Sequence, residues 1–331
     1  MKFFCRIIIL ICIFFCSNSY AGAPMQLPDA KLTIKVVDED NKPLPHIPIH
    51  VWLSEAVIFD SQTDSNGVFV AEGKCTVKEV PIRIVKEGFY DSMNLLIFTN
   101  YPNINDNKWY PWNPVVTAVV RRIINPIPMF AKCLETKIPK TNECFGYDLE
   151  IGDWVTPAGK GVVSDLVFSI EGVWQNYRDN DSTLTLTFSQ PNDGLVTVGH
   201  DVLDRRPTGS KFILPRNAAD SGYVNCFKWR RVRKQLTDSI QDQVVDDVNV
   251  EGRDYIFRVR SQTNEAGVVT NACYGKFHGN IEFVGAAGNS QGSWLKFTYY
   301  LNPNPNDRNL EFDPKRNLFK NLKSTEEVRE P

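Results

Sequence analysis

The sequence predicts an all-β protein, with an N-terminal β-sandwich followed by a second, mostly antiparallel β domain. Apolar residues alternate with polar residues along many short segments, which is the period of half-buried strands. Residues typical of turns (Gly, Pro, Asn and Asp) separate these segments. The chain has 331 residues, of which 42% are hydrophobic and 23% charged, so it has enough apolar material for two domains of ordinary size.

The first 21 residues have the pattern of a secretory signal peptide. Lys2 and Arg6 flank the start of an apolar run, Ile7–Phe15, and small residues stand at Ser19 and Ala21. The apolar run is too short to cross a bilayer as a helix. We therefore expect cleavage after Ala21 and export to the periplasm, the cell surface or the medium.

Composition narrows the location and the partners further. Cys16 offers a lipoprotein alternative, but Phe14 and Phe15 precede it where small residues are usual. The remaining chain has no other long apolar run, so no integral membrane segment is expected after cleavage. The formal net charge of −2 disfavours nucleic acid and leaves an unidentified protein or a glycan as the partner.

Residues 31–121 form the first predicted domain. Asp64–Gly67 is a turn in which Gly67 is expected to take a positive φ that side chains with a Cβ resist. Asp40–Pro43 is a second turn. The strands expected here lie at Lys31–Asp38, Ile47–Val51, Val68–Val70, Ile82–Val85 and Val115–Val120.

Four short motifs of this region resemble the carboxypeptidase regulatory-like family. They are Val37-Asp38, Asn41–Pro45, Thr63–Phe69 and Lys86–Phe89. Members typically carry V-D-x-x-G-x-P-L-P-G, T-D-x-x-G-x-F and a late G-Y. In this chain Asn stands for the first Gly and Phe for the Tyr. The resemblance covers about a quarter of the chain and implies a prealbumin-like, transthyretin-like sandwich that brings no catalytic residues of its own.

A Pro-rich linker is predicted at 122–145, followed by a second β domain at 146–301 that resembles no family. One short helix is possible at Gln235–Val248, where apolar residues recur at a spacing of four. Residues 302–331 are polar and rich in Pro and Asn, so we expect an extended tail that frays over the surface. The alternating segments of the second domain are Asp165–Ile170, Thr183–Phe188, Tyr255–Arg260 and Leu295–Leu301.

The loop containing Trp109, Tyr110 and Trp112 is the candidate ligand-binding site. Flat aromatic rings on a sandwich loop can stack on sugar rings. The same rings could instead be buried between the two domains, which is usual for large aromatic residues near a linker.

His200 and His278 form the one titratable pair that could meet in the second domain. An enzyme would also need a nucleophile on a defined turn, and neither a Gly-x-Ser-x-Gly elbow nor a His-Glu-x-x-His helix is present. No catalytic residue is assigned, and neither a metal nor another cofactor is expected. The basic run Lys228–Lys234 is interpreted as a salt-bridged edge strand.

Five cysteines follow the signal region, and an exported protein meets an oxidising compartment. Cys133 and Cys144 are close in sequence, so a disulfide between them closes only a short loop. Cys226 and Cys273 form a second candidate pair. Cys75 is then left as an unpaired thiol.

These observations favour an exported, non-catalytic β-domain protein that serves as a binding or structural module at the cell surface or in the periplasm. The first alternative is a carbohydrate-binding accessory protein that uses the aromatic loop. The second alternative is a hydrolase with an unrecognised active site that involves one of the two histidines.

Overall fold

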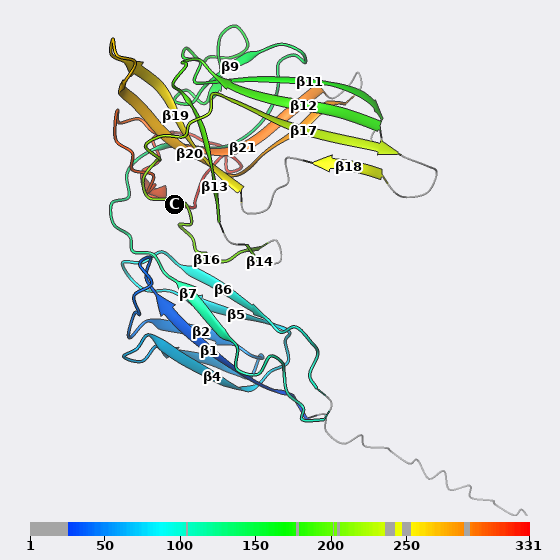
Figure 1. Cartoon of the computed structure of the whole chain (residues 1–331), viewed down its shortest axis with the longest axis vertical. Coiled ribbons are helices and arrows are strands. Elements are labelled where there is room, and N and C mark those ends of the chain that lie inside the picture. Colours follow the sequence, from blue (N-terminus) through cyan, green and yellow to red (C-terminus); the bar gives the residue numbers. More distant parts are fainter. Residues whose placement is uncertain are drawn as a thin grey trace, which may run out of the picture.

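The computed structural model contains two β-sandwiches joined end to end (Figure 1). It describes residues 26–331 except 104, 177–178, 201, 204–205, 236–241, 247–252 and 288–291, so the predicted signal peptide and Cys16 lie outside the described residues. The described residues include no α-helix and a single 3₁₀ turn, η1 at Pro314–Arg316. The all-β prediction is therefore confirmed.

The N-terminal sandwich pairs a three-stranded sheet, β4-β1-β7, with a sheet in the order β6-β5-β2-β3. Alternate residues of the central strands point inward, and Leu32, Ile34 and Val36 on β1 are fully buried. Gly67 has φ +72°, as predicted. The strands are β1 Asp29–Val37, β2 Pro48–Trp52, β3 Ile58–Gln62, β4 Val68–Lys74, β5 Glu79–Ile84, β6 Ser92–Ile97 and β7 Val115–Val119.

The C-terminal sandwich has a six-stranded sheet, β10-β9-β11-β12-β17-β18, facing a five-stranded sheet, β13-β19-β20-β21-β8. Its core is aromatic, with Phe168, Phe257, Phe277 and Phe297 buried between the sheets. The six-stranded sheet comprises β9 Phe145–Asp148, β10 Asp153–Trp154, β11 Leu166–Asn176, β12 Asp179–Phe188, β17 Cys226–Gln235 and β18 Asp242–Asp246. The five-stranded sheet comprises β8 Phe130–Lys137, β13 Gly194–Gly199, β19 Arg253–Thr263, β20 Val269–Ala287 and β21 Gly292–Asn302.

Two segments predicted to be a linker and a helix contain strands in the structure. Residues 130–137 of the predicted linker form β8, which pairs with β21 from Phe130↔Leu301 to Lys137↔Trp294. Within the predicted short helix, Asp242–Asp246 is strand β18, which pairs antiparallel with β17. Because β18 covers one side of β17 and β12 covers the other, the basic strand is not at a sheet edge. Pairing with a neighbouring strand thus outweighs the Pro content of the linker in one place and the helical spacing in the other.

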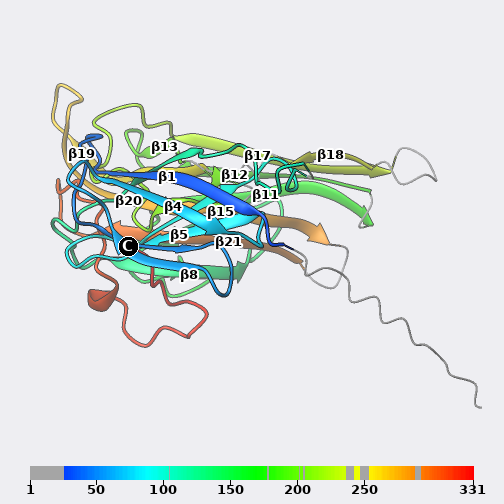
Figure 2. The same ribbon diagram turned by 90° about the horizontal axis from the view of Figure 1, so that it is seen from below.

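The C-terminal segment 302–331 packs against the outer face of the five-stranded sheet, beside β8 (Figure 2). Phe312 is fully buried with Met129, Ala131 and Tyr300, and its ring lies 5.2 Å from that of Tyr300. Leu310 is buried against Ile256 and Tyr274 in a neighbouring cluster. The segment therefore covers a second buried face of this sheet, where the sequence pattern suggested a polar surface tail.

Candidate functional site

The second domain adds a short strand to the first domain's sheet. Strand β16, Gly209–Ser210, pairs antiparallel with β6, with Gly209 opposite Met93 and Ser210 opposite Ser92. The Lys211 N–H then donates to the carbonyl oxygen of Asp91 at 2.8 Å. Near β16 lies the two-stranded ribbon of β14, Val202–Leu203, and β15, Arg206–Pro207. Figure 1 shows this stretch reaching down from the C-terminal sandwich onto the N-terminal one.

Two arginines fix this contact. The Arg121 guanidinium donates to the carbonyl oxygens of Phe212 at 2.7 Å and Leu214 at 2.6 Å, and to Glu39 at 2.7 Å. Arg216 donates to the other Glu39 oxygen at 2.6 Å. Burial alone would raise the pKa of Glu39, but the two guanidinium groups hold it below its ordinary value.

Glu311 connects the C-terminal segment to the same joint. Its carboxylate accepts from the Tyr90 hydroxyl at 2.8 Å and from the N–H groups of Ile124 at 2.9 Å and Asn125 at 2.8 Å. Arg216 forms an ion pair with it at 3.1 Å. Despite burial, which opposes ionisation, these donors lower the pKa of Glu311. The two sandwiches are thus held by strand pairing and by a partly buried charge network.

Beneath the 208–213 segment, one buried carboxylate brings the two predicted histidines together. Asp254 on β19 contacts the Nδ1 atom of His200, and its other oxygen lies 3.7 Å from Nδ1 of His278. The Gly279 N–H donates to the same carboxylate at 2.6 Å. Burial would raise the pKa of Asp254, yet the hydrogen bonds with His200 and Gly279 keep it below its ordinary value. Burial lowers the pKa of His278.

Lys276 lies fully buried in the same layer, on β20. Its Nζ atom makes no hydrogen bond with any described residue. Instead it lies 4.9 Å from the centre of the Phe212 ring and 4.5 Å from that of Tyr300. Burial lowers the pKa of Lys276 to about 7, with Asp254 opposing the shift. This ammonium group is therefore only partly charged at neutral pH.

A cavity lies on each side of the 208–213 segment. The first, of about 380 Å³, is lined by His278 and Lys211 together with Arg83 of the N-terminal sandwich. The second, of about 350 Å³, is lined by His200 and Arg121. Ser210 lines both cavities, and its buried Oγ atom has no hydrogen-bond partner among the described residues. Each histidine held by Asp254 thus borders a different cavity.

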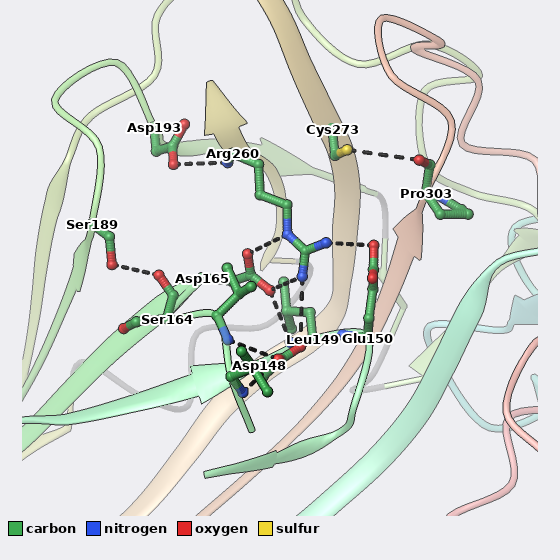
Figure 3. Close-up of polar contacts among 12 residues, drawn as sticks. Asp148, Leu149, Glu150, Ser164, Asp165, Ser189, Asp193, Arg260, Cys273 and Pro303 are labelled. Atoms are coloured by element: carbon green, nitrogen blue, oxygen red, sulfur yellow. Dashed lines mark hydrogen bonds and ion pairs between the residues drawn. The ribbon is translucent and has the colours of Figure 1, made fainter. Parts of the chain in front are cut away.

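In a second polar cluster of the C-terminal sandwich, the charged side chains pair with one another (Figure 3). Arg260 donates to both oxygens of the buried Asp165, at 2.7 and 2.9 Å, and pairs with Glu150 at 2.5 Å. Asp148 lies 3.5 Å from the same guanidinium. The Arg260 guanidinium therefore occupies the position among these carboxylates that a metal ion would take. Among the described residues no group of His, Cys, Asp and Glu is arranged to hold a metal ion.

The predicted aromatic site is divided by the structure. Trp109 is buried in the core of the N-terminal sandwich, stacked at 5.2 Å on Phe98, and its Nε1–H donates to the carbonyl oxygen of Cys75 at 2.9 Å. Trp112 is half-buried, with Lys108 Nζ 4.8 Å from its ring centre. Tyr110 is also half-buried, and its hydroxyl donates to Asp106. Trp109 therefore packs within one domain, not between the two.

The structure shows neither of the two expected disulfides. All five described cysteines are free thiols. Cys133 lies on β8 and Cys273 on β20 of one sheet, whereas Cys144 precedes β9 and Cys226 begins β17 of the other. Within the predicted Cys133–Cys144 loop, Cys133 lies on β8, whereas Cys144 directly precedes β9 of the other sheet. Burial raises the pKa of the Cys273 thiol to about 11.

Asp254 and Lys276 were missed by the sequence reasoning. Both stand in strands whose alternation predicts a solvent-facing outer side, so a charged residue there raises no suspicion. One signal was available. Lys276 is the only charged residue in the run Ala272–Phe277, which is otherwise apolar, aromatic or Gly. A lysine in such a run is a candidate for burial.

No family model and no curated protein matches the chain. Among solved structures, it is similar to catechol 1,2-dioxygenase from Acinetobacter, with 11% identity and a TM-score of 0.23 over 31% of this chain and 55% of that one. The chain thus spans about half the length of that protein. The major pilin subunit of Bacillus cereus is 8% identical, with a TM-score of 0.22 over 81% of this chain and 95% of that one.

A DUF3823 family protein from Parabacteroides merdae is 9% identical, with a TM-score of 0.18 over 87% of this chain and the whole of that one. TM-scores this low identify no shared family. The likeness to the carboxypeptidase regulatory-like family therefore stays a prediction from the motifs. Among the described residues, no helix has the length and apolar character needed to cross a membrane.

Proposed function

We propose that the protein is an exported, non-catalytic module of the cell surface or the periplasm, in which two β-sandwiches form one rigid body that presents a binding surface. The observation that carries this proposal is the joint. Strand β16 of one domain completes a sheet of the other, and Arg121 and Arg216 connect the backbone and carboxylates of both. Such a joint suits a protein that must transmit force or keep a surface in a fixed orientation.

Export is tested by expressing the chain with its own N-terminus in a bacterial host and fractionating the cells. The mature protein should be found outside the cytoplasm and should begin at Gly22. A lipid-modified start at Cys16 would support the lipoprotein alternative. Uncleaved protein retained in the cytoplasm would contradict export altogether.

Rigidity is tested by small-angle scattering of the wild type and of Arg216→Ala. The wild type should keep one maximum dimension across salt concentrations. The variant should sample more extended shapes, because Glu39 and Glu311 lose their shared cation. Lys74→Gln, which removes an exposed ion pair with Asp29 at the opposite end of β1 from Glu39, is the control. A flexible wild type would contradict the proposal.

One observation favours the hydrolase as a second candidate function. His200 and His278 are both held by a buried carboxylate and border cavities that Ser210 also lines. Neither imidazole makes a hydrogen bond with the Ser210 hydroxyl in the structure. A serine-directed fluorophosphonate should label Ser210 if this alternative is right, and should fail to label Ser210→Ala. No labelling of the wild type would exclude a serine nucleophile at this position.

A further inference from the structure

The cavity lined by His278 has the chemistry of a small ligand site. Lys211 and Arg83 lie on its wall with His278. The side chains of Lys211 and Arg83 are each about half exposed. Their carboxylate partners are distant: Arg83 lies 3.6 Å from Asp91, and Lys211 lies 4.0 Å from Glu330. These loose pairs leave both cations able to contact another anion. Met93 and Ile213 supply an apolar part of the wall.

Two buried polar atoms near this cavity lack partners. Ser210 is 6% exposed and lines the cavity, and its Oγ atom has no hydrogen bond among the described residues. Lys276 Nζ, fully buried against Phe212 of the other cavity wall, also has none. A buried hydroxyl without a partner costs about 1–3 kcal/mol, which a ligand that accepts its hydrogen bond would recover.

The charge balance of the layer beneath changes with pH. Among the described residues, Asp254 is the carboxylate that pairs with both His200 and His278, and Lys276 lies in the same layer. When all three bases are protonated, three cations share one buried negative charge. Glu330 and Asp91 on the cavity wall already face Lys211 and Arg83. An added anion would offset the surplus.

We propose that this cavity binds a small organic carboxylate, whose oxygens are held by His278, Ser210 and Lys211 and whose apolar body lies against Met93 and Ile213. The apolar wall selects an organic acid over inorganic phosphate, because phosphate offers nothing to bury there. This inference deepens the proposed binding function by naming a ligand class.

The proposal fixes the sign of the pH dependence. His278 is mostly neutral at pH 7.5, since burial lowers its pKa. A bound carboxylate favours the imidazolium and therefore raises the pKa of His278. By linkage, affinity increases as the pH falls through the pKa of His278, until the ligand itself becomes protonated.

The experiment follows the four histidines, with His278 as the reporter of binding and His46 as the internal control. Their imidazole signals are followed by NMR from pH 5 to 8 in purified protein, with and without sodium butyrate. Butyrate should raise the pKa of His278 by about one unit. At each pH, butyrate should leave the signal of His46 unchanged, because that exposed turn residue does not line the cavity. His50 is no control, because it lies opposite Arg83 in the pairing of β2 with β5. Sodium chloride and inorganic phosphate at equal ionic strength are the comparison anions.

Two variants test the assigned contacts. Ser210→Ala and Lys211→Gln should each weaken butyrate binding about three- to tenfold, because each removes a hydrogen bond to the carboxylate. Lys42→Gln removes an exposed lysine that has a comparable surface ion pair, and should leave the affinity unchanged. Both site variants change side chains at the joint surface, so circular dichroism must first show wild-type unfolding transitions.

Several results would overturn the proposal. Equal responses of all four histidines would show a general salt effect. A phosphate response equal to that of butyrate would remove the selection for an organic acid, and no response to either anion would remove the site. Each result is obtained with purified protein, so it leaves the fractionation test of export unaffected.

Discussion

The two sandwiches bury their sheets in different ways. In the N-terminal domain, β1 and β2 alternate between buried and partly exposed residues, so each sheet has one apolar face and one wet face. In the C-terminal domain, β19 has Asp254 through Phe257 buried in succession, and β21 ends in four consecutive buried residues. Its five-stranded sheet is covered on both faces. The aromatic core covers the inner face, and segments 208–220 and 302–331 cover the outer face.

This difference explains where the unusual chemistry lies. A wet face tolerates charged residues, whereas a covered face must provide partners for them or shift their pKa values. Asp254, Lys276 and the two histidines all lie on the covered outer face. The N-terminal sandwich has no comparable buried charge among its described residues. The domain joint is therefore one of the places where ionisable groups are held in a low-dielectric environment, and the Asp165–Arg260 cluster is another.

The largest expected effect tests the core of the simpler domain. Trp109→Ala should destabilise the N-terminal sandwich by about 3–5 kcal/mol, because it empties a core site and leaves the Cys75 carbonyl without its donor. Trp112→Ala, on a half-buried ring of the same loop, should cost less than about 1 kcal/mol. Denaturant unfolding measures both. Loss of glycan retention in Trp112→Ala at unchanged stability would support the carbohydrate-binding alternative.

The next effect tests whether the buried cluster on the outer face of the five-stranded sheet contributes to stability. Phe312→Ala should cost about 3 kcal/mol, since the ring is fully buried against Tyr300, Met129 and Ala131. Leu322→Ala, in the same segment but outside that cluster, is the control and should have little effect. A wild-type unfolding midpoint for Phe312→Ala would mean that the segment frays, and the comparison between the two domains would fail.

Lys276→Met should stabilise the protein. This result would show that a charged residue on the covered sheet face costs stability that it would not cost on a solvent-exposed face. Replacing a buried ammonium by an apolar side chain of similar length should increase the free energy of unfolding by about 1–4 kcal/mol near pH 6. The pKa of Lys276 is about 7 in the folded state and about 10.4 when unfolded. Between these values the unfolded wild type binds one more proton, so wild-type stability rises with pH.

The gain from Lys276→Met should therefore be full below pH 7 and should vanish toward pH 10. Urea unfolding at pH 6, 8 and 10 measures it. Lys296→Met, on a partly exposed lysine of the neighbouring strand, is the control and should show no such trend. A destabilised Lys276→Met at every pH would mean that the ammonium is needed where it lies.

Two glycines of the N-terminal sandwich separate crowding from backbone strain. Gly67 and Gly88 both have positive φ, +72° and +79°. A Cβ on Gly67 would lie 2.9 Å from the Leu44 nitrogen and the Val36 oxygen, whereas a Cβ on Gly88 meets nothing within 4 Å. Gly67→Ala should cost about 2–3 kcal/mol, and Gly88→Ala about 1 kcal/mol. Equal losses would show that φ alone decides.

The smallest expected effect concerns the thiols. Cys144 is exposed and Cys273 buried, so a maleimide should modify Cys144 within minutes and Cys273 only after unfolding. Cys144→Ser should leave the unfolding midpoint within about 0.5 kcal/mol of the wild type. Peptide mapping of exported protein that finds Cys133 linked to Cys144 would instead support the disulfide predicted from the sequence.

The sequence by itself determined the fold class, most of the strands and several turns. Alternation at Leu32–Val36 and at Thr183–Phe188 suffices because each of these strands has one face in the core and one facing away from it. The φ of Gly67 was predictable because an Asp-Ser-Asn-Gly turn demands it. These features depend on near neighbours in the chain, so local chemistry specifies them.

Only the tertiary structure decided which sheet is covered on both faces and which polar residues meet. β16 adds to a sheet formed more than a hundred residues earlier, and Glu39 meets Arg216 across a separation of 177 residues. The sequence named His200 and His278 as a pair, but not Asp254, which contacts both, or Lys276 in the same layer. No local pattern encodes such contacts, because pairing and burial depend on how distant strands pack, which the period of a single strand does not determine.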